Sequence, residues 1–176
     1  MIRCPAPAKL PNLPTRLDYR LTGVGMNIII AAVGRLKSGP EKHLWDDYAR
    51  RLTWSFKLKE VEEKNLLPPR QMREKEGTLL LEKVPSGAVV IALDKSGKSL
   101  SSNHFAEHFQ AWMTDGVKDV TFLVGGPDGL SPDVLARAQH RLSMGEQTWP
   151  HLLARCMLLE QIYRAQCILG NHPYHK

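Results

Sequence analysis

The sequence predicts an α/β domain with a mostly parallel sheet. Short apolar runs rich in β-branched residues occupy positions 27–33, 88–93 and 120–124, and segments with helical periodicity separate them. A strand that is covered on both faces reads as a continuous apolar run, and strands that alternate with helices favour parallel pairing. At 176 residues, the chain fits one domain of this class.

The first 25 residues contain four prolines and no sustained apolar pattern, so we expect them to be disordered. The first buried strand follows over residues 27–33 and ends at Gly34. We expect Met26 to be the true start, with a domain over residues 26–176. A mitochondrial transit peptide is the alternative interpretation, which the prolines disfavour.

The next elements are two helices and the strand between them. Residues 41–53 carry apolar side chains at helical spacing, which predicts an amphipathic helix, and residues 56–61 alternate as in a half-exposed strand. Residues 68–69, both proline, open a helix that extends to about residue 83. Gly77 near its middle lowers the helix propensity.

Turn signals bound the elements of the second half. Pro85-Ser86-Gly87 precedes the strand at 88–93, and Ser101 or Ser102 caps a helix that ends at Gly116. The strand at 120–124 runs directly into the glycine-rich loop 125–129.

A strong helix start follows that loop, since Ser131, Pro132 and Asp133 supply an N-cap, a proline at the first position and an acidic first turn. Residues 142–144 are predicted to form a last short strand.

The last helix spans residues 151–169, with Pro150 at its first turn and Gly170 after its end. Its apolar residues are too numerous for one stripe, so we expect it to be covered on most sides. Glu160 and Arg164 form a favourable i,i+4 pair. Arg155 has no acidic neighbour one turn away, which favours an anionic or hydrogen-bonding ligand as its partner; a surface arginine is the alternative.

Composition excludes several classes of protein. The chain has no apolar run long enough to span a membrane and no secretory signal pattern, so we expect a cytoplasmic protein. Its three cysteines lack the C-x-x-C spacing, which indicates reduced thiols. Of the net charge of +6, half falls in residues 1–25; the remainder is compatible with RNA binding but not diagnostic.

A ligand site is expected where two strands end, at Leu93-Asp94 and Val124-Gly125, because ligands of open α/β sheets bind beyond the carboxyl ends of strands. Gly125 and Gly126 permit positive φ and leave room for a ligand against the backbone. A tight turn is the alternative. The loop lacks the spacing of a Walker motif or a dinucleotide fingerprint.

Four segments then carry a family resemblance: LVGGPDGLSP at 123–132, TWPH at 148–151, EQIYRA at 160–165 and the terminal HPYHK. In order and spacing they resemble the ribosomal RNA large subunit methyltransferase H group of the SPOUT methyltransferases. The resemblance covers residues 26–176.

The resemblance implies a homodimer with a C-terminal trefoil knot. It also implies methylation of N3 of a pseudouridine in 23S ribosomal RNA, within the assembled ribosome, with S-adenosyl-L-methionine (SAM) as the cofactor. Carried over position by position, the implied cofactor residues are Leu93, Gly125, Gly145, Glu146, Gln147, Thr148, Trp149 and Pro150.

The imide N3 must lose its proton, so the reaction needs a base or a group that stabilises the anion. His151, Tyr174 and His175 are candidates for proton handling, and Arg155 can offset negative charge or hold a phosphate. The three candidates for proton handling also have structural interpretations: His151 as a hydrogen-bond donor at the helix start, Tyr174 as a packing anchor and His175 as a tail residue.

The residues themselves also bear on a metal site, on a dimer and on rival functions. His172 and His175 suit a metal site only on a helix, which Pro173 disfavours, so no metal is expected. The apolar last helix favours a dimer. The rival functions are a non-enzymatic RNA-binding or ribosome-associated module and a nucleotide-binding hydrolase, which would need a phosphate-binding motif that the sequence lacks.

Overall fold

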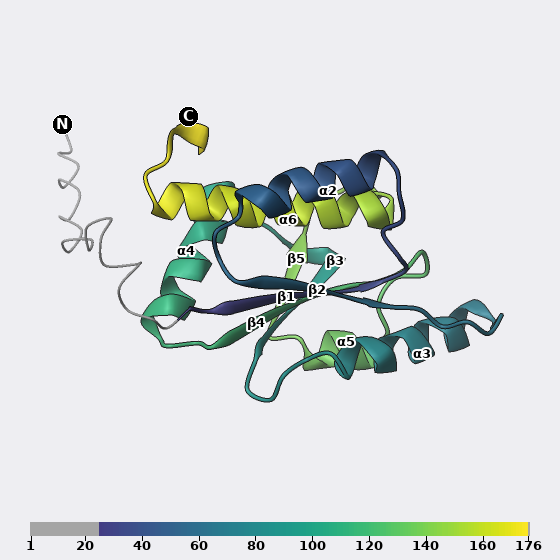
Figure 1. Ribbon diagram of the computed structural model, residues 1–176. Coiled ribbons are helices and arrows are strands. Elements are labelled where there is room, and N and C mark those ends of the chain that lie inside the picture. The colour runs from purple at the N-terminus through teal and green to yellow at the C-terminus, as the bar shows by residue number, and fades with distance from the viewer. Residues whose placement is uncertain (1–24, 176) are drawn as a thin grey trace, which may run out of the picture.

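The computed structural model describes residues 25–175. The expectations for residues 1–24, and the terminal Lys176, lie outside the described residues. Within them, the predicted α/β class is confirmed, because five parallel strands form one sheet between two layers of helices (Figure 1).

The strand order in the sheet is β2-β1-β4-β3-β5, and every pairing is parallel. The bounds are β1 Asn27–Val33, β2 Phe56–Val61, β3 Val89–Ser99, β4 Asp119–Val124 and β5 His140–Ser143. Leu93 pairs with Val124 on one side and with Leu142 on the other, so the carboxyl ends of β3, β4 and β5 lie side by side.

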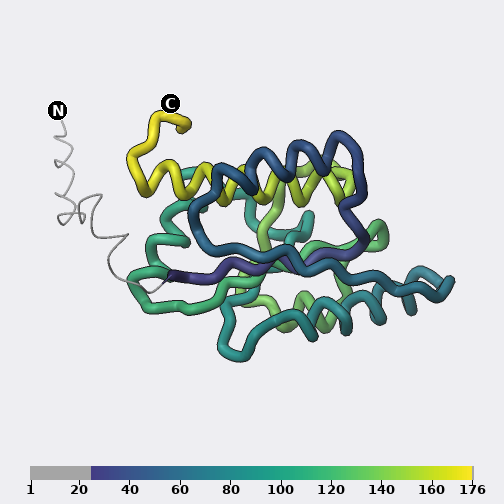
Figure 2. Tube along the Cα trace, in the orientation of Figure 1, coloured from purple at the N-terminus to yellow at the C-terminus, as the bar shows by residue number. Residues whose placement is uncertain are grey.

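The helices divide between the two faces of the sheet. Figures 1 and 2 show α2, α4 and α6 on one face and α3 and α5 on the other. Their bounds are α2 Pro40–Arg51, α3 Pro69–Leu81, α4 Ser102–Thr114, α5 Pro132–Arg137 and α6 His151–Leu169, with a short 3-10 turn at Pro173–His175. None of the described helices is long and apolar enough to cross a membrane.

Each face of the sheet has its own core. Along β1, Ile28 and Ile30 belong to the core under α2, α4 and α6, whereas Ala31 and Val33 pack with the α3 and α5 side. This alternation buries both faces of the strand, which explains why its sequence is continuously apolar.

Strand β3 is longer than predicted, because it continues to Ser99 through a polar stretch. Leu142 of β5 pairs with both Leu93 and Lys98, so the residues between them form a bulge. A Cβ on Gly97 would lie 2.5 Å from the Arg141 backbone. The extension depends on this close approach to β5 and not on apolar burial, so hydrophobic patterning misses it.

The apolar surface of α6 is largely covered within the chain. The helix contacts α2 and α4 and shares one core with β1 and β4, and none of its residues is classed as exposed. The expected coverage is confirmed. Several of its apolar side chains remain half-buried, including Leu153 and Met157, and the dimer that the sequence favours stays a prediction.

Gly77 has a structural reason to interrupt the α3 sequence. It is buried where α3 packs on α5, and a Cβ there would lie 2.2 Å from the Ser131 hydroxyl oxygen, which caps α5 by accepting from Val134 N–H. The glycine therefore serves the contact between the helices at the expense of helix propensity.

We expect Gly77→Ala to destabilise the protein by about 1–3 kcal/mol, because the overpacking against Ser131 outweighs the gain in helix propensity. Urea unfolding measures the change. Gln71→Ala, at an exposed position of α3, is the matched control and should not destabilise. An equally stable Gly77→Ala protein would contradict this account.

Candidate functional site

A cleft of about 840 Å³ lies at the carboxyl ends of β3, β4 and β5. The strand ends, the loop after β4, the loop before α6 and the first turn of α6 line it. Of the predicted cofactor residues, it contains Leu93, Gly125, Gly145, Gln147, Thr148, Trp149 and Pro150. Glu146 is exposed and does not line the cleft.

The sequence left two interpretations of the glycines after β4, and the structure favours the tight turn for Gly125. A Cβ on Gly125 would lie 2.8 Å from the Gly129 backbone, so its absence allows the loop to fold back on itself. Positive φ occurs at Gly129 (+80°) and not at Gly125 or Gly126. The tight-turn interpretation therefore explains Gly125, and the loop it forms is one wall of the cleft.

The loop before α6 is held by its own polar contacts. Gly145 has a φ of +107°, and the Ser143 hydroxyl both donates to the Gly145 carbonyl (2.9 Å) and accepts from its N–H (3.2 Å). The Trp149 indole N–H donates to the Met144 carbonyl at 3.2 Å, while 39% of this residue remains exposed. An indole fixed at one edge leaves ring surface available beside the cleft.

His151 is the first residue of α6 and lines the cleft. Its imidazole lies against Gly34, where a Cβ would be 3.4 Å from Nε2. Burial, and then the positive charge of Arg155, lower the pKa of His151 below its ordinary value. The histidine is therefore predominantly neutral at pH 7 and able to accept a proton.

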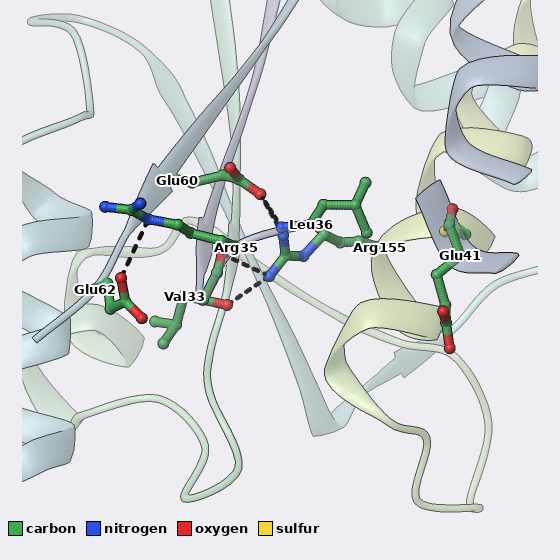
Figure 3. Close-up of polar contacts among 9 residues, drawn as sticks. Val33, Arg35, Leu36, Glu41, Glu60, Glu62 and Arg155 are labelled. Carbon is green, nitrogen blue, oxygen red and sulfur yellow. Dashed lines mark hydrogen bonds and ion pairs between the residues drawn. The ribbon is translucent and has the colours of Figure 1, made fainter. Parts of the chain in front are cut away.

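Arg155 is fully buried and joins α6 to two strand ends (Figure 3). Its guanidinium donates to Glu60 Oε1 at 3.0 Å, to the Val33 carbonyl at 2.5 Å and to the Gly34 carbonyl at 3.1 Å. The prediction that Arg155 needs a ligand as its partner is wrong, because Glu60 on β2 supplies the negative charge.

Glu60 is shared between two donors. The Leu36 N–H donates to the same Oε1 at 2.6 Å, so one carboxylate ties together the β1–α2 connection, β2 and α6. Since Arg155 does not line the cleft, its contribution to the site is to fix the position of His151 one turn earlier.

The tail lies against the other end of α6. The Tyr174 hydroxyl donates to Glu160 at 3.0 Å and lies 3.3 Å from the Tyr48 hydroxyl, and its ring packs 4.8 Å from Tyr163. Twelve residues separate Tyr163 from His151, a distance of about 18 Å along a helix. Within one chain, Tyr174 and His175 are therefore not brought to the cleft.

Comparison with known proteins decides the family. A family model described as "Predicted SPOUT methyltransferase" matches residues 26–175. The chain belongs to this SPOUT methyltransferase family. Proteins named "Ribosomal RNA large subunit methyltransferase H" are similar to it: that of Paramagnetospirillum magneticum is 48% identical over 151 residues, and that of Hyphomonas neptunium is 47% identical over 154. Each alignment covers 86% of this chain and 99% of the relative.

A solved structure has a related fold. It is a probable methylase family protein from Haemophilus influenzae Rd KW20, with a TM-score of 0.51 and 13% identity, covering 86% of this chain and 70% of that chain. At this identity the likeness concerns the fold alone. The trefoil knot that the SPOUT resemblance implies stays a prediction.

Three polar residues that line the cleft were not assigned a role from the sequence. Asp94, Asp128 and Arg73 line the cleft. Asp94 lies at the strand end where the sequence places a ligand site, and Asp128 lies in the glycine-rich loop after β4, a placement that would have marked it; nothing in the local pattern of α3 marks Arg73. Within residues 25–175, no group of three or more metal-ligating side chains that could hold a metal ion is found.

We expect Arg155→Met to cost about 3 kcal/mol of unfolding free energy, because it leaves the charge of Glu60 without its cation and two backbone carbonyls without this donor. Arg164→Met is the matched control, since Arg164 is on the same helix, pairs with Glu160 and is partly exposed. Its loss should stay near 1 kcal/mol or below. Similar losses for both variants in urea unfolding would argue against the anchoring role of Arg155.

The stability that depends on His151 should vary with pH. Its pKa is lowered in the folded protein, so the unfolded chain binds this proton more readily. The wild type should therefore lose stability relative to His151→Gln as pH falls below about 6.5, the ordinary histidine value, and this difference should be constant above it. Paired unfolding curves between pH 5 and 8 measure the effect. The opposite slope would show a raised pKa.

Proposed function

We propose that the protein is a SAM-dependent methyltransferase that acts on N3 of a pseudouridine in large-subunit (23S) ribosomal RNA. The observation that carries this proposal is the cleft, which gathers seven of the eight proposed cofactor residues at the carboxyl edge of the sheet in a SPOUT methyltransferase chain. The names of its relatives support a ribosomal RNA substrate.

The residues of the cleft fit a cofactor such as SAM. A volume of about 840 Å³ lies within the range of roughly 300–1,000 Å³ typical of small-molecule sites. Leu93, Leu142 and Trp149 offer apolar surface for an adenine, and Gly125 and Gly145 line the same cleft without side chains. When bound, SAM supplies an electrophilic methyl group on a sulfonium, which requires no metal.

The chain would then supply positioning and proton transfer. His151 borders the cleft and is largely neutral at pH 7, so it is the group that would accept the proton from N3. Arg155 acts through His151, because its bonds to β1 and β2 fix the first turns of α6. Holding two reactants in line contributes up to about 7–11 kcal/mol in well-oriented cases.

We further propose that the protein acts as a homodimer in the cytoplasm. Trp149, at the cleft, and Leu44 are exposed. Leu44 and the half-buried Met157 line a second pocket that shares Met144 and Gly145 with the cleft, so apolar surface lies beside it. A partner covering this surface can bring its own tail, with Tyr174 and His175, toward the site. A monomer in light scattering at micromolar concentration would exclude this arrangement.

The proposal predicts methyl transfer to ribosomes. With methyl-labelled SAM and ribosomes that lack the modification, digestion of the 23S RNA and mass spectrometry should find label on N3 of one pseudouridine. His151→Gln should slow transfer by about 10²–10⁴-fold, as expected for loss of a general base, without loss of SAM binding. His104→Gln, at an exposed position of α4, is the control.

The other outcomes distinguish the rival functions. SAM binding without label would indicate another acceptor. Ribosome association with no affinity for SAM would indicate a non-enzymatic ribosome-associated module. Binding of a nucleoside triphosphate with magnesium, and not SAM, would indicate a hydrolase.

A further inference from the structure

Two buried polar atoms without a hydrogen-bond partner lie one helical turn apart on α3. They are Nε of Arg73 and Oε2 of Glu76, and they belong to a set of only five such side-chain atoms in the described part of the chain. Residues at i and i+3 share a helix face. One turn of α3 therefore presents an unused donor and an unused acceptor on the same side.

Glu76 lies directly behind the glycine loop of the cleft. The residue is 8% exposed, and its two carboxylate oxygens are 3.0 and 3.4 Å from the position that a Cβ on Gly126 would take. Gly126 itself lines the cleft. Glu76 does not itself line the cleft, but the missing Cβ of Gly126 leaves its carboxyl group next to the backbone of a residue that does.

Arg73 reaches the cleft from the same helix and is one of its lining residues. It makes no ion pair with Glu76 or with any other acid in the described residues, although Glu76 is one turn away. A guanidinium that lines a cleft and has a buried, unpaired N–H is suited to bind an anionic group there.

The surroundings of Glu76 favour a cationic neighbour. Burial, followed by the negative charges of Asp128 and Glu63, raises the pKa of the Glu76 carboxyl. Asp128 also lines the cleft. A positive group of a ligand placed beside them would stabilise the charged carboxylate.

Resting on the proposed function, we propose that Arg73 and Glu76 bind the amino-acid end of SAM, with Arg73 on the carboxylate and Glu76 on the ammonium group. This end is the part of the cofactor that carries an anion and a hydrogen-bonding cation next to each other. The adenine and ribose present neutral groups, which do not require a guanidinium.

The test measures ligand binding by calorimetry. It compares two ligands with an uncharged sulfur, and SAM is measured beside them. S-adenosylhomocysteine keeps the amino-acid end, and 5′-methylthioadenosine lacks it. Arg73→Met and Glu76→Gln should each weaken binding of S-adenosylhomocysteine about tenfold or more, as expected for a lost charge-assisted hydrogen bond, and change binding of methylthioadenosine less than about twofold. Arg70→Met and Glu74→Gln, an exposed pair on the same helix, are the matched controls.

Each other outcome counts against the assignment. Equal weakening of both ligands would show that the two side chains only support the fold of the cleft. Weaker binding of SAM with unchanged binding of S-adenosylhomocysteine in Glu76→Gln would place Glu76 at the sulfonium instead. A wild type that binds none of the three would overturn the proposed function as well.

Folding is tested separately. Since Oε2 of Glu76 has no partner to lose, the ligand-free Glu76→Gln protein should melt at or above the wild-type temperature. If that variant fails to fold, Glu76→Asp replaces it, because the shorter carboxylate keeps the charge and should still lose affinity for S-adenosylhomocysteine selectively.

Discussion

The buried ion pair between Arg155 and Glu60 is the interaction on which the site depends. A guanidinium keeps its charge in a protein, so a fully buried one must be matched in charge and hydrogen bonds or it strongly destabilises the fold. Here a carboxylate and the two carbonyls at the end of β1 provide that match. The geometry of these acceptors fixes where α6 begins and which way its first turn faces.

This anchor couples stability to chemistry. The same guanidinium that holds α6 also lies near His151 and disfavours its protonation, in addition to the effect of burial. The cleft is then bounded by elements whose positions are each determined by a strand end: β4 leads into the glycine loop, β5 into the loop before α6, and β1 into the Gly34 turn against His151. A shift of α6 would change all of these contacts together.

Patterns that are local in sequence were predicted well. Apolar runs, N-caps and helix breakers gave the α/β class, each of the five strands and the full extent of α6, and the strand ends indicated the cleft. The partner of Arg155 was missed because it lies 95 residues away on a strand that looks merely half-exposed. The sequence left the role of Gly125 open between a tight turn and a ligand contact, because the atoms that it avoids belong to its own loop and a sequence does not show which side of a glycine is crowded.

The structure also separates the candidates for proton handling. Burial, and then hydrogen bonds with Tyr48 and Glu160, strongly raise the pKa of Tyr174, so its phenolate form is disfavoured while the tail is packed on its own chain. A tyrosine that donates to Glu160 is a poor base in that position and a good anchor. His151 has the opposite properties, since it borders the cleft and its environment keeps the imidazole neutral. At a partner's site, a Tyr174 held in this way would contribute as a hydrogen-bond donor and not by removing a proton.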